Sequence, residues 1–394
     1  MSDADGAGVV SVFLRHGSDV LLCRRSEAVG SGSGRWGVVA GHAGGDPERL
    51  AREAVREGTG LDPGDCSPVR RGASFPVEDP DHGAWRVHPV LFDCPTREVT
   101  TNRGTAAQEW VQPTAILDRE TVPWLWESYR RVAPTVAAVR EDREHGSEYV
   151  SRRAVEVLRD AAAALAAGVD APVAVPDGEG EDEWSRLTAL ADGLLGARAS
   201  IAVVANRVNR VTFEARGDRE ASAVRHAAER LLAGLDDARI EAPDALRGAT
   251  VATLSRSGTV RDLLARCDPT EVVIAESRPG GEGRAAGAAL ADTLAVDVTL
   301  CGDAGIAHAS TPATPTRCWS ARTPCSRTGA WSTRSGLGRW RAPPPHRTCP
   351  STSRPTLTRS RRRGTGSTSS RATRTSCSGP TRRPRWGSNS RRST

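Results

Sequence analysis

Short hydrophobic runs separated by turn residues dominate the first part of the chain. Val9–Leu14 and Val20–Cys23 are joined by His16–Asp19, which favours a turn, and this pattern predicts a β-hairpin. Trp36–Ala40 is expected to be a further strand, and the glycine-rich segment Gly41–Pro47 after it is expected to be a loop. The chain is therefore predicted to begin with a β-sheet.

A helix is predicted directly after this loop. Asp46 can cap it and Pro47 can open it, and apolar residues then recur at helical spacing over Leu50–Gly58. Glu109–Pro113 is expected to be the last strand of this domain, and Val122–Trp126 is expected to turn into a closing helix. A sheet combined with these helices predicts an α/β fold for the first domain.

The middle of the chain is patterned as helices and the next segment as a parallel sheet. Helices are predicted over Tyr149–Ala167, Trp184–Ala215 and Asp218–Leu235. Strand and helix patterns then alternate, beginning and ending with a strand, over Thr250–Leu254, Thr259–Ala265, Glu271–Glu276, Gly281–Leu294 and Val296–Cys301. Such alternation is typical of a doubly wound, Rossmann-like parallel sheet. Because only three strands precede the end of the pattern, the sheet is expected to be truncated.

The charge of the chain changes abruptly at residue 303. Asp303 is the last acidic residue, and residues 304–394 contain 19 arginines and no carboxylate. That segment carries a net charge of +19, while residues 1–303 carry −13, with 35 arginines against 48 acidic residues. Because residues 309–394 contain too little Leu, Ile, Val and Phe to bury a core, they are expected to form a disordered basic tail.

Two interpretations of this tail stay open. A single-nucleotide frame change would let the segment Thr314–Trp331 encode a buried strand, a Gly-Ala-Asp turn and a hairpin, which is the strand that the sheet lacks. Alternatively, the tail binds nucleic acid non-specifically through its arginines. The frame change is the preferred hypothesis, because the sequence as it stands has no comparable hydrophobic pattern there.

The overall composition excludes several classes of protein. The acidic, lysine-free body resembles proteins of salt-loving archaea, and 394 residues leave room for two or three domains. No apolar run approaches the roughly 20 residues that span a bilayer, and the acidic N-terminus is no signal sequence, so a cytoplasmic protein without membrane partners is expected. The nine cysteines lack C-x-x-C spacing, which indicates neither a disulfide framework nor a zinc site.

The loop and helix over residues 41–61 resemble the signature of the Nudix family, which ends in Arg-Glu-x-x-Glu-Glu-x-Gly-Leu. The resemblance implies the Nudix α/β/α fold for residues 1–140. In that family, carboxylates on one helical face hold divalent cations on a diphosphate. Here Gly60 and Leu61 fix the register so that Glu57 matches a metal-ligand position, whereas Glu53 stands at the arginine position. The other two glutamate positions are Ala54 and Gly58.

Several roles remain open for these residues. One carboxylate makes a poor Mg²⁺ site, so hydrolysis is not expected, and the domain is interpreted as a degenerate Nudix module. The alternative is a diphosphatase that uses Glu53 and Glu57 as catalytic residues in an unusual register, with Mg²⁺ as cofactor at Glu57. Both glutamates also suit a solvated helical face beside arginines. Trp124 and Trp126 suit either a packed domain edge or a platform for base stacking.

Anion-binding groups follow the first two parallel strands. Ser255–Val260 opens a helix at the strand end, and Glu276–Arg284 does the same with two guanidinium groups. These motifs, followed by Leu300–Ala304, resemble the translation initiation factor 2B α/β/δ family, which shares its fold with ribose-1,5-bisphosphate isomerase and methylthioribose-1-phosphate isomerase. The candidate phosphate-binding residues are Arg198, Ser255, Arg256, Ser257, Gly258, Thr259, Arg278, Glu282, Gly283 and Arg284.

The same resemblance shows what is missing for isomerisation. The isomerases carry a cysteine after the first strand, and Ser255 stands in its place here. A serine hydroxyl is a much weaker acid than a thiol, so it is a poor substitute in proton transfer. Cys301 fits a buried strand position better than a catalytic one. Arg198, assigned to the second helix of the bundle, fits a helix cap as well as a phosphate ligand.

The expected organisation is a Nudix-like domain (1–140), a helical subdomain (147–245), a Rossmann-like part (246–308) and the tail (309–394). The leading hypothesis is a binding or regulatory protein that recognises a phosphorylated small molecule, either a sugar phosphate or a nucleotide. The family implies a homodimer if the C-terminal part is intact. The alternatives are an enzyme, either a Nudix hydrolase or a sugar-phosphate isomerase, and a translation initiation factor.

Overall fold

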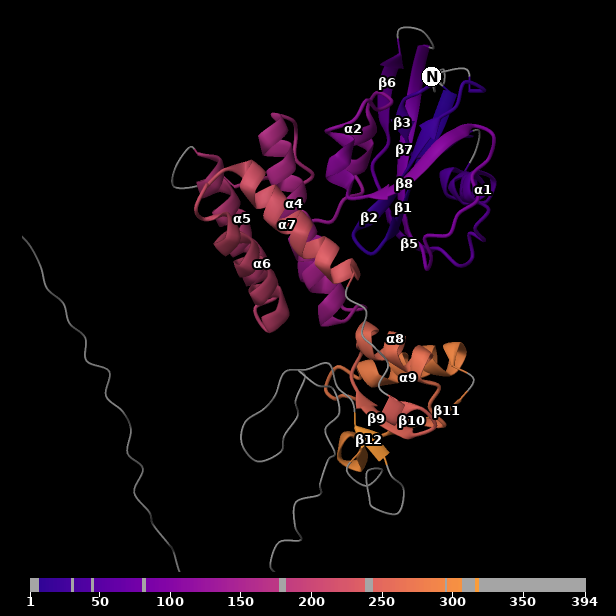
Figure 1. Cartoon of the computed structure of the whole chain (residues 1–394), viewed down its shortest axis with the longest axis vertical. Helices are drawn as coiled ribbons and strands as arrows, with labels where there is room; N and C mark the ends of the chain where they lie inside the picture. Colours follow the sequence, from indigo (N-terminus) through magenta and orange to yellow (C-terminus); the bar gives the residue numbers. More distant parts are fainter. Residues whose placement is uncertain are drawn as a thin grey trace, which may run out of the picture. The chain divides into compact units, whose positions relative to one another are not determined.

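The structure is a computed structural model that describes residues 7–29, 32–43, 46–79, 83–176, 182–237, 244–294, 296–306 and 316–318. These residues form a mixed sheet with flanking helices, a helix bundle and a second, parallel sheet, which confirms the predicted α/β class (Figure 1). Apart from residues 316–318, the expected tail lies outside the described residues. Within the described part of the chain, no helix is long and apolar enough to cross a membrane.

The first sheet contains eight strands. The predicted hairpin forms between β1 (Ala7–His16) and β2 (Asp19–Arg25). β1 also pairs in parallel with β7 (Gly83–Asp93) and antiparallel with β4 (Val39–Ala43). The remaining strands are β3 (Trp36–Gly37), β5 (Ser67–Arg71), β6 (Phe75–Asp79) and β8 (Thr105–Val111).

This sheet differs from the sequence-based prediction in two places. The expected strand Trp36–Ala40 is two strands, because β3 pairs with β2 whereas β4 pairs with β1. β4 also continues to Ala43, into the expected loop. Strands β5, β6 and β7 were not predicted, because Pro68, Pro76 and Pro89 interrupt the alternation of polar and apolar residues on which such a prediction rests.

Helices cover both faces of the first sheet. α1 (Pro47–Thr59) begins as predicted, since the Asp46 carboxylate accepts a hydrogen bond from the Glu48 N–H, and it ends at Gly60 in the left-handed conformation. Its buried face packs on the sheet side formed by Val10, Val12 and their neighbours. The opposite side of the sheet packs against η1 (Pro113–Ile116) and α2 (Leu125–Arg130). This is the α/β/α arrangement that the resemblance implied.

A helix bundle follows, with one apolar core. Its members are α3 (Val136–Glu141), α4 (Ser147–Ala167), α5 (Glu183–Ala197), α6 (Ala202–Ala215) and α7 (Ala221–Asp237). α4 is buried from Val150 to Ala164, because its apolar face packs in the bundle and its polar face binds the β1–β2 hairpin.

The bundle corrects two expectations. The single helix predicted over Trp184–Ala215 is interrupted at Arg198, where the backbone leaves helical geometry. α3 packs in the bundle core, although its residues were assigned almost entirely to the first domain. Neither feature was predictable, because apolar spacing continues through both segments.

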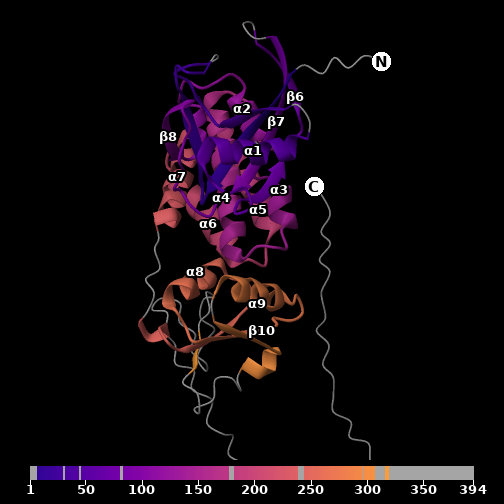
Figure 2. The ribbon, with the colours of Figure 1, turned by 90° about the vertical axis from the view of Figure 1, so that its right-hand side faces the viewer.

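The parallel sheet forms where it was predicted. β9 (Thr250–Leu254), β10 (Glu271–Ala275) and β11 (Asp297–Cys301) alternate with α8 (Gly258–Cys267) and α9 (Glu282–Thr293). Both helices cover the same face of the sheet (Figure 2), as right-handed crossovers require. Short 3-10 turns η2 (Asp244–Leu246) and η3 (Asp303–Gly305) flank it.

A fourth strand joins this sheet. β12 (Thr316–Cys318) pairs in parallel with β9, so the sheet order is β11-β10-β9-β12. Three strands and a structureless tail were expected, and both expectations are wrong at these residues. β12 pairs through backbone groups with the open edge of the sheet at β9. A pattern of side chains does not reveal such pairing.

Candidate functional site

A cavity of about 360 Å³ lies beside the first sheet. β1 and β4 form its floor, α1 contributes Ala54 and Glu57, and residues 122–125 close it from another side. Asn102 also lines the cavity, and its side chain donates a hydrogen bond to the Glu57 carbonyl. This bond holds the segment around Asn102 against α1. The lining is rich in valine and also contains polar side chains, among them Arg25, His42 and Glu57. Cavities of this size and composition are typical of small-molecule sites.

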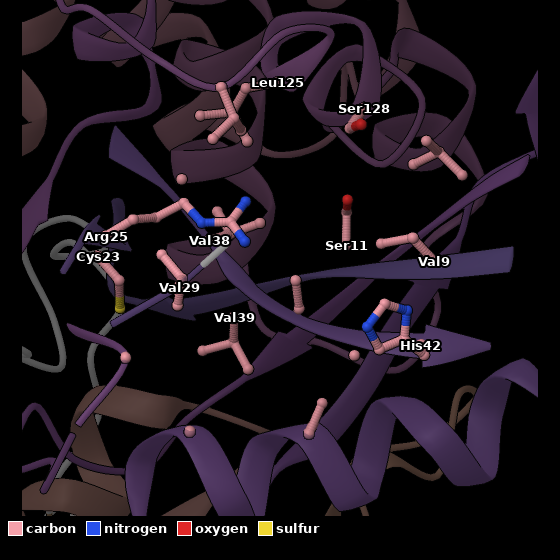
Figure 3. Close-up of a pocket in the computed structure, with 18 of the residues that line it drawn as sticks. Val9, Ser11, Cys23, Arg25, Val29, Val38, Val39, His42, Leu125 and Ser128 are labelled. Carbon is pink, nitrogen blue, oxygen red and sulfur yellow. The ribbon is translucent and has the colours of Figure 1, made fainter. Parts of the chain in front are cut away.

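One guanidinium in this cavity has no counter-ion among the residues that the structure describes. Arg25 is the last residue of β2, is half-buried, and stands across the cavity from His42 (Figure 3). Burial lowers the pKa of Arg25, and no charged group among the described residues offsets this effect. A guanidinium remains charged even so. An unpaired charge facing an apolar cavity is suited to an anionic ligand.

The carboxylates of α1 do not come together at this cavity. Glu57 lines it, whereas Glu53 is absent from the wall and forms an ion pair with Arg49. Among the residues that the structure describes, no group of three or more His, Cys, Asp or Glu side chains could hold a metal ion. Mg²⁺ needs octahedral oxygen coordination anchored by carboxylates, so the residues present do not fit the metal site that the Nudix signature implies.

Aromatic side chains form part of the cavity wall. The rings of His42 and Trp85 are stacked, with centroids 6.1 Å apart. Trp124 also lines the cavity and is half exposed, whereas Trp126 packs against Tyr129 and donates its Nε1–H to the Asp170 carbonyl. The packing interpretation therefore applies to Trp126, whereas Trp124 is exposed enough to contact a ligand.

A second group of polar residues lies at the carboxyl ends of the parallel strands. Ser255 and Ser277 both adopt positive φ angles, 63° and 62°, which are rare for residues other than glycine. The Ser255 N–H donates to Ser277 Oγ over 2.6 Å. The Asp303 carboxylate accepts hydrogen bonds from the backbone N–H groups of Ser277 and Arg278 at 2.6 and 2.7 Å. Three strand ends are thereby tied together.

Two of the four arginines predicted to bind phosphate, Arg278 and Arg284, are paired with a carboxylate. Glu276 accepts hydrogen bonds from Arg278 Nε at 2.8 Å and from Arg284 Nη2 at 2.6 Å. These bonds lower the pKa of Glu276. Both arginine side chains are mostly exposed, at 70% and 60%. A phosphate at this position has to displace Glu276 from both guanidinium groups.

The start of α8 has the geometry of a helix N-terminus open to a ligand. Ser257 caps it, with Oγ accepting from the Val260 N–H at 3.3 Å. Gly258 and Thr259 are its first two residues, and a Cβ added at Gly258 meets nothing within 4 Å. Arg256 lies just before the cap, and its buried Nε has no hydrogen-bond partner in the described part of the chain.

The start of α9 is much more crowded. Gly281 precedes it at a φ of 71°, and Glu282 is its first residue. A Cβ at Gly283 would lie 1.8 Å from the Ala275 carbonyl oxygen. Only glycine therefore lets this helix approach the end of β10, and Gly283 has a packing role.

One segment of the chain matches a known family. Residues 143–310 match the family model described as the initiation factor 2 subunit family. We refer to this segment as the initiation factor 2B-like domain. It contains α4 to α9 and the strand ends described above. No curated protein matches the chain.

Solved structures of Nudix proteins match 32% of the chain. A Nudix hydrolase from M. smegmatis, RenU, is 20% identical with a TM-score of 0.27 over 82% of its own length. The MutT protein from Methanosarcina mazei Go1 is 20% identical with a TM-score of 0.27 over 91%. An Ap4A hydrolase from C. elegans is 12% identical with a TM-score of 0.28 over 94%.

The structure separates one predicted residue of the initiation factor 2B-like domain from the others. Arg198 ends α5 and donates hydrogen bonds to the carbonyls of Val139 and Asp142, so it caps α3. This contact supports the cap rather than the phosphate ligand. It also corrects the assignment of Arg198 to the second helix, because the residue lies between α5 and α6.

Three residues that belong to these sites were not predicted as site residues from the sequence. Arg25 has no motif around it, and only its position at the end of an apolar strand could have drawn attention to it. Glu276 and Asp303 belong to the predicted motifs, but their contacts were not predicted. Glu276 contacts Arg278, and Asp303 contacts the backbone of Ser277 and Arg278. Their pairing depends on strands β10 and β11 being neighbours, which the alternation of strands and helices could have indicated.

Proposed function

We propose that this protein binds a phosphorylated small molecule of nucleotide type in the cavity of its first sheet and does not hydrolyse it. The observation that supports the proposal is an apolar cavity that contains an unpaired guanidinium, Arg25, and a single carboxylate, Glu57. The valine-rich wall with Trp85 suits the base and sugar. Arg25 suits a phosphate, with which a guanidinium forms bidentate hydrogen bonds.

The chemistry of the cavity supports binding without turnover. Nudix-type hydrolysis needs several carboxylates to hold cations on a diphosphate, and the wall supplies only Glu57. Cys23 also lines the cavity, but burial raises its pKa to about 11, so the thiol stays neutral and is a poor nucleophile. The residues of this cavity therefore favour binding of the ligand over its hydrolysis.

A sugar phosphate at the parallel strand ends is the second candidate. The strained backbone at Ser255 and Ser277 favours it, because such conformations concentrate at functional sites. The open N-terminus of α8 also suits an anion. We place it second because Glu276 already occupies Arg278 and Arg284.

The decisive experiment measures binding and turnover on the same full-length protein. ADP is the probe, and release of phosphate or AMP is followed with Mg²⁺ present. The proposal predicts saturable ADP binding without product. Mg²⁺-dependent turnover that Glu57→Gln abolishes would instead establish the hydrolase alternative.

Matched variants locate the binding. Arg25→Gln removes the guanidinium from the cavity and is expected to weaken ADP binding by about 10-fold or more, as expected for one charged hydrogen-bonding partner. Arg24→Gln is the control, because Arg24 is an exposed neighbour that donates to the Gly34 carbonyl. Equal losses in both variants contradict the proposed location.

A further inference from the structure

A second cavity lies between the first sheet and the start of α4. Its volume is about 300 Å³, and its walls come from β1, β5, β7, residues 132–145 and the first turns of α4. Val69, Leu91 and Val132 make part of the wall apolar. Four arginines also line it. Three are buried or half-buried, namely Arg15 from β1, Arg70 from β5 and Arg153 from α4, and the fourth, Arg143, is exposed.

The three guanidinium groups are unequally paired. Arg15 forms a bidentate ion pair with Asp93, at 2.6 and 3.0 Å, and donates to the Tyr149 hydroxyl. Arg70 has one protein partner among the described residues, the Ala133 carbonyl, which carries no charge. Arg70 therefore adds a positive charge to the cavity wall without a carboxylate of its own.

Arg153 is buried and incompletely hydrogen-bonded. Its side chain is 8% exposed, and Nη2 donates to the Gly17 carbonyl at 2.6 Å. Nη1 lies 2.9 Å from Glu156 Oε2 but outside hydrogen-bond geometry, and Nε has no acceptor in the described part of the chain. Buried polar groups without partners are rare and costly, so these N–H groups favour an additional acceptor.

Arg15, Arg70 and Arg153 together carry one positive charge more than the two carboxylates paired with Arg15 and Arg153. Asp93 and Glu156 are the carboxylates that face the three arginines. Burial lowers the pKa of Arg70 and of Arg153, and the charge of Arg15 lowers both further. Because guanidinium groups stay protonated, Arg15 repels both Arg70 and Arg153, and Glu156 and Asp93 offset part of this repulsion at Arg153.

Aromatic and acidic side chains also line this cavity. His145 stacks on Tyr149, with ring centroids 3.8 Å apart, and its Nδ1 contacts Asp142 at 2.9 Å. Glu141 and Glu144 also line the cavity, and because both are exposed, solvent strongly screens their charges.

We propose that this cavity binds a compact phosphate group, held by Arg70 and Arg153. The site is made by residues of both the first sheet and α4, so its ligand also stabilises the contact between them. It is independent of the nucleotide-type site at Arg25, which shares none of its lining residues.

The test is thermal unfolding of the full-length protein while inorganic phosphate replaces chloride at constant ionic strength. A saturable rise in Tm is expected, since a ligand that binds the folded state stabilises it. Arg70→Gln is expected to weaken the phosphate dependence about 10- to 100-fold, and Arg70→Lys to retain part of it. No saturable rise in the wild-type protein would overturn the proposal.

Three control variants show which arginines matter. Arg71→Gln alters the exposed neighbour on β5, while Arg25→Gln and Arg278→Gln alter the other two candidate sites. Arg71→Gln should respond to phosphate like the wild-type protein, and Arg25→Gln and Arg278→Gln should keep the part of the response that Arg70→Gln removes. An unchanged response in Arg70→Gln would place the phosphate elsewhere and overturn the proposal.

Ribose 5-phosphate tests which kind of phosphate the cavity binds. If it binds more tightly than inorganic phosphate and its binding depends on Arg70, the ligand is a phosphomonoester. If it binds equally or more weakly, the ligand is free phosphate.

Discussion

The buried ion pair between Arg159 and Asp160 makes the sharpest energetic prediction. The Arg159 side chain is fully buried and lies 2.7 Å from Asp160, whose other oxygen accepts the Tyr129 hydroxyl hydrogen bond at 2.8 Å. Arg159 also donates to the Ser18 carbonyl at 3.3 Å and to Gln112 at 3.2 Å. It therefore connects α4 to the first sheet as well as neutralising Asp160.

Arg159→Met keeps most of the side-chain volume and removes the charge. Asp160 is then left buried with Tyr129 as its remaining partner, and breaking a buried pair from one side costs about 3–5 kcal/mol. With a urea m-value of about 2 kcal/mol/M, the unfolding midpoint should fall by about 2 M. The assay is urea unfolding followed by tryptophan fluorescence and circular dichroism.

A matched surface variant and a double variant complete the test. Arg210→Met breaks an exposed i,i+4 pair with Glu214 on α6 and should cost less than about 0.5 kcal/mol. Arg159→Met combined with Asp160→Leu should recover much of the loss, because no uncompensated charge remains. If Arg159→Met costs no more than Arg210→Met, the pair is not the buried connection described here.

Three further predictions concern local structure and pH. Asp46→Ala removes the α1 cap and should lower the unfolding free energy by about 1 kcal/mol in chemical denaturation. Gly283→Ala should destabilise the parallel sheet by about 1–3 kcal/mol or more through overlap with β10, whereas Gly302→Ala, where a Cβ meets nothing, should be nearly neutral by differential scanning calorimetry. Burial opposes ionisation of Asp93, but Arg15 lowers its pKa below the ordinary value, so this carboxylate stabilises the fold at neutral pH and loses that effect as pH falls below about 5. Asp93→Asn should thus be less stable than wild type at neutral pH, and the two should converge in acid unfolding titrations.

Local signals in the sequence predicted much of the fold. Asp46, Pro47 and Gly60 mark the ends of α1 because capping depends on neighbouring residues alone. β9, β10 and β11 were placed to within one residue at each end because each is a short run rich in β-branched and apolar residues. Where proline interrupts the pattern, in β5, β6 and β7, the same reasoning failed.

The sites depend on contacts between distant residues, and these were harder to predict. Cys66 and Cys94 are 28 positions apart, yet their sulfur atoms lie 3.5 Å from each other because β5 pairs with β7. Arg70 and Arg153 face one cavity only because α4 packs against the first sheet. No spacing rule within one segment connects such residues.

The most direct test of the central claim is a calorimetric titration of ADP into the full-length protein, with EDTA and then with Mg²⁺. The account predicts the same affinity in both buffers, because Arg25 rather than a metal ion holds the phosphate, and a loss of about 10-fold or more in Arg25→Gln. Binding that requires Mg²⁺, or that is unchanged by Arg25→Gln, would contradict it.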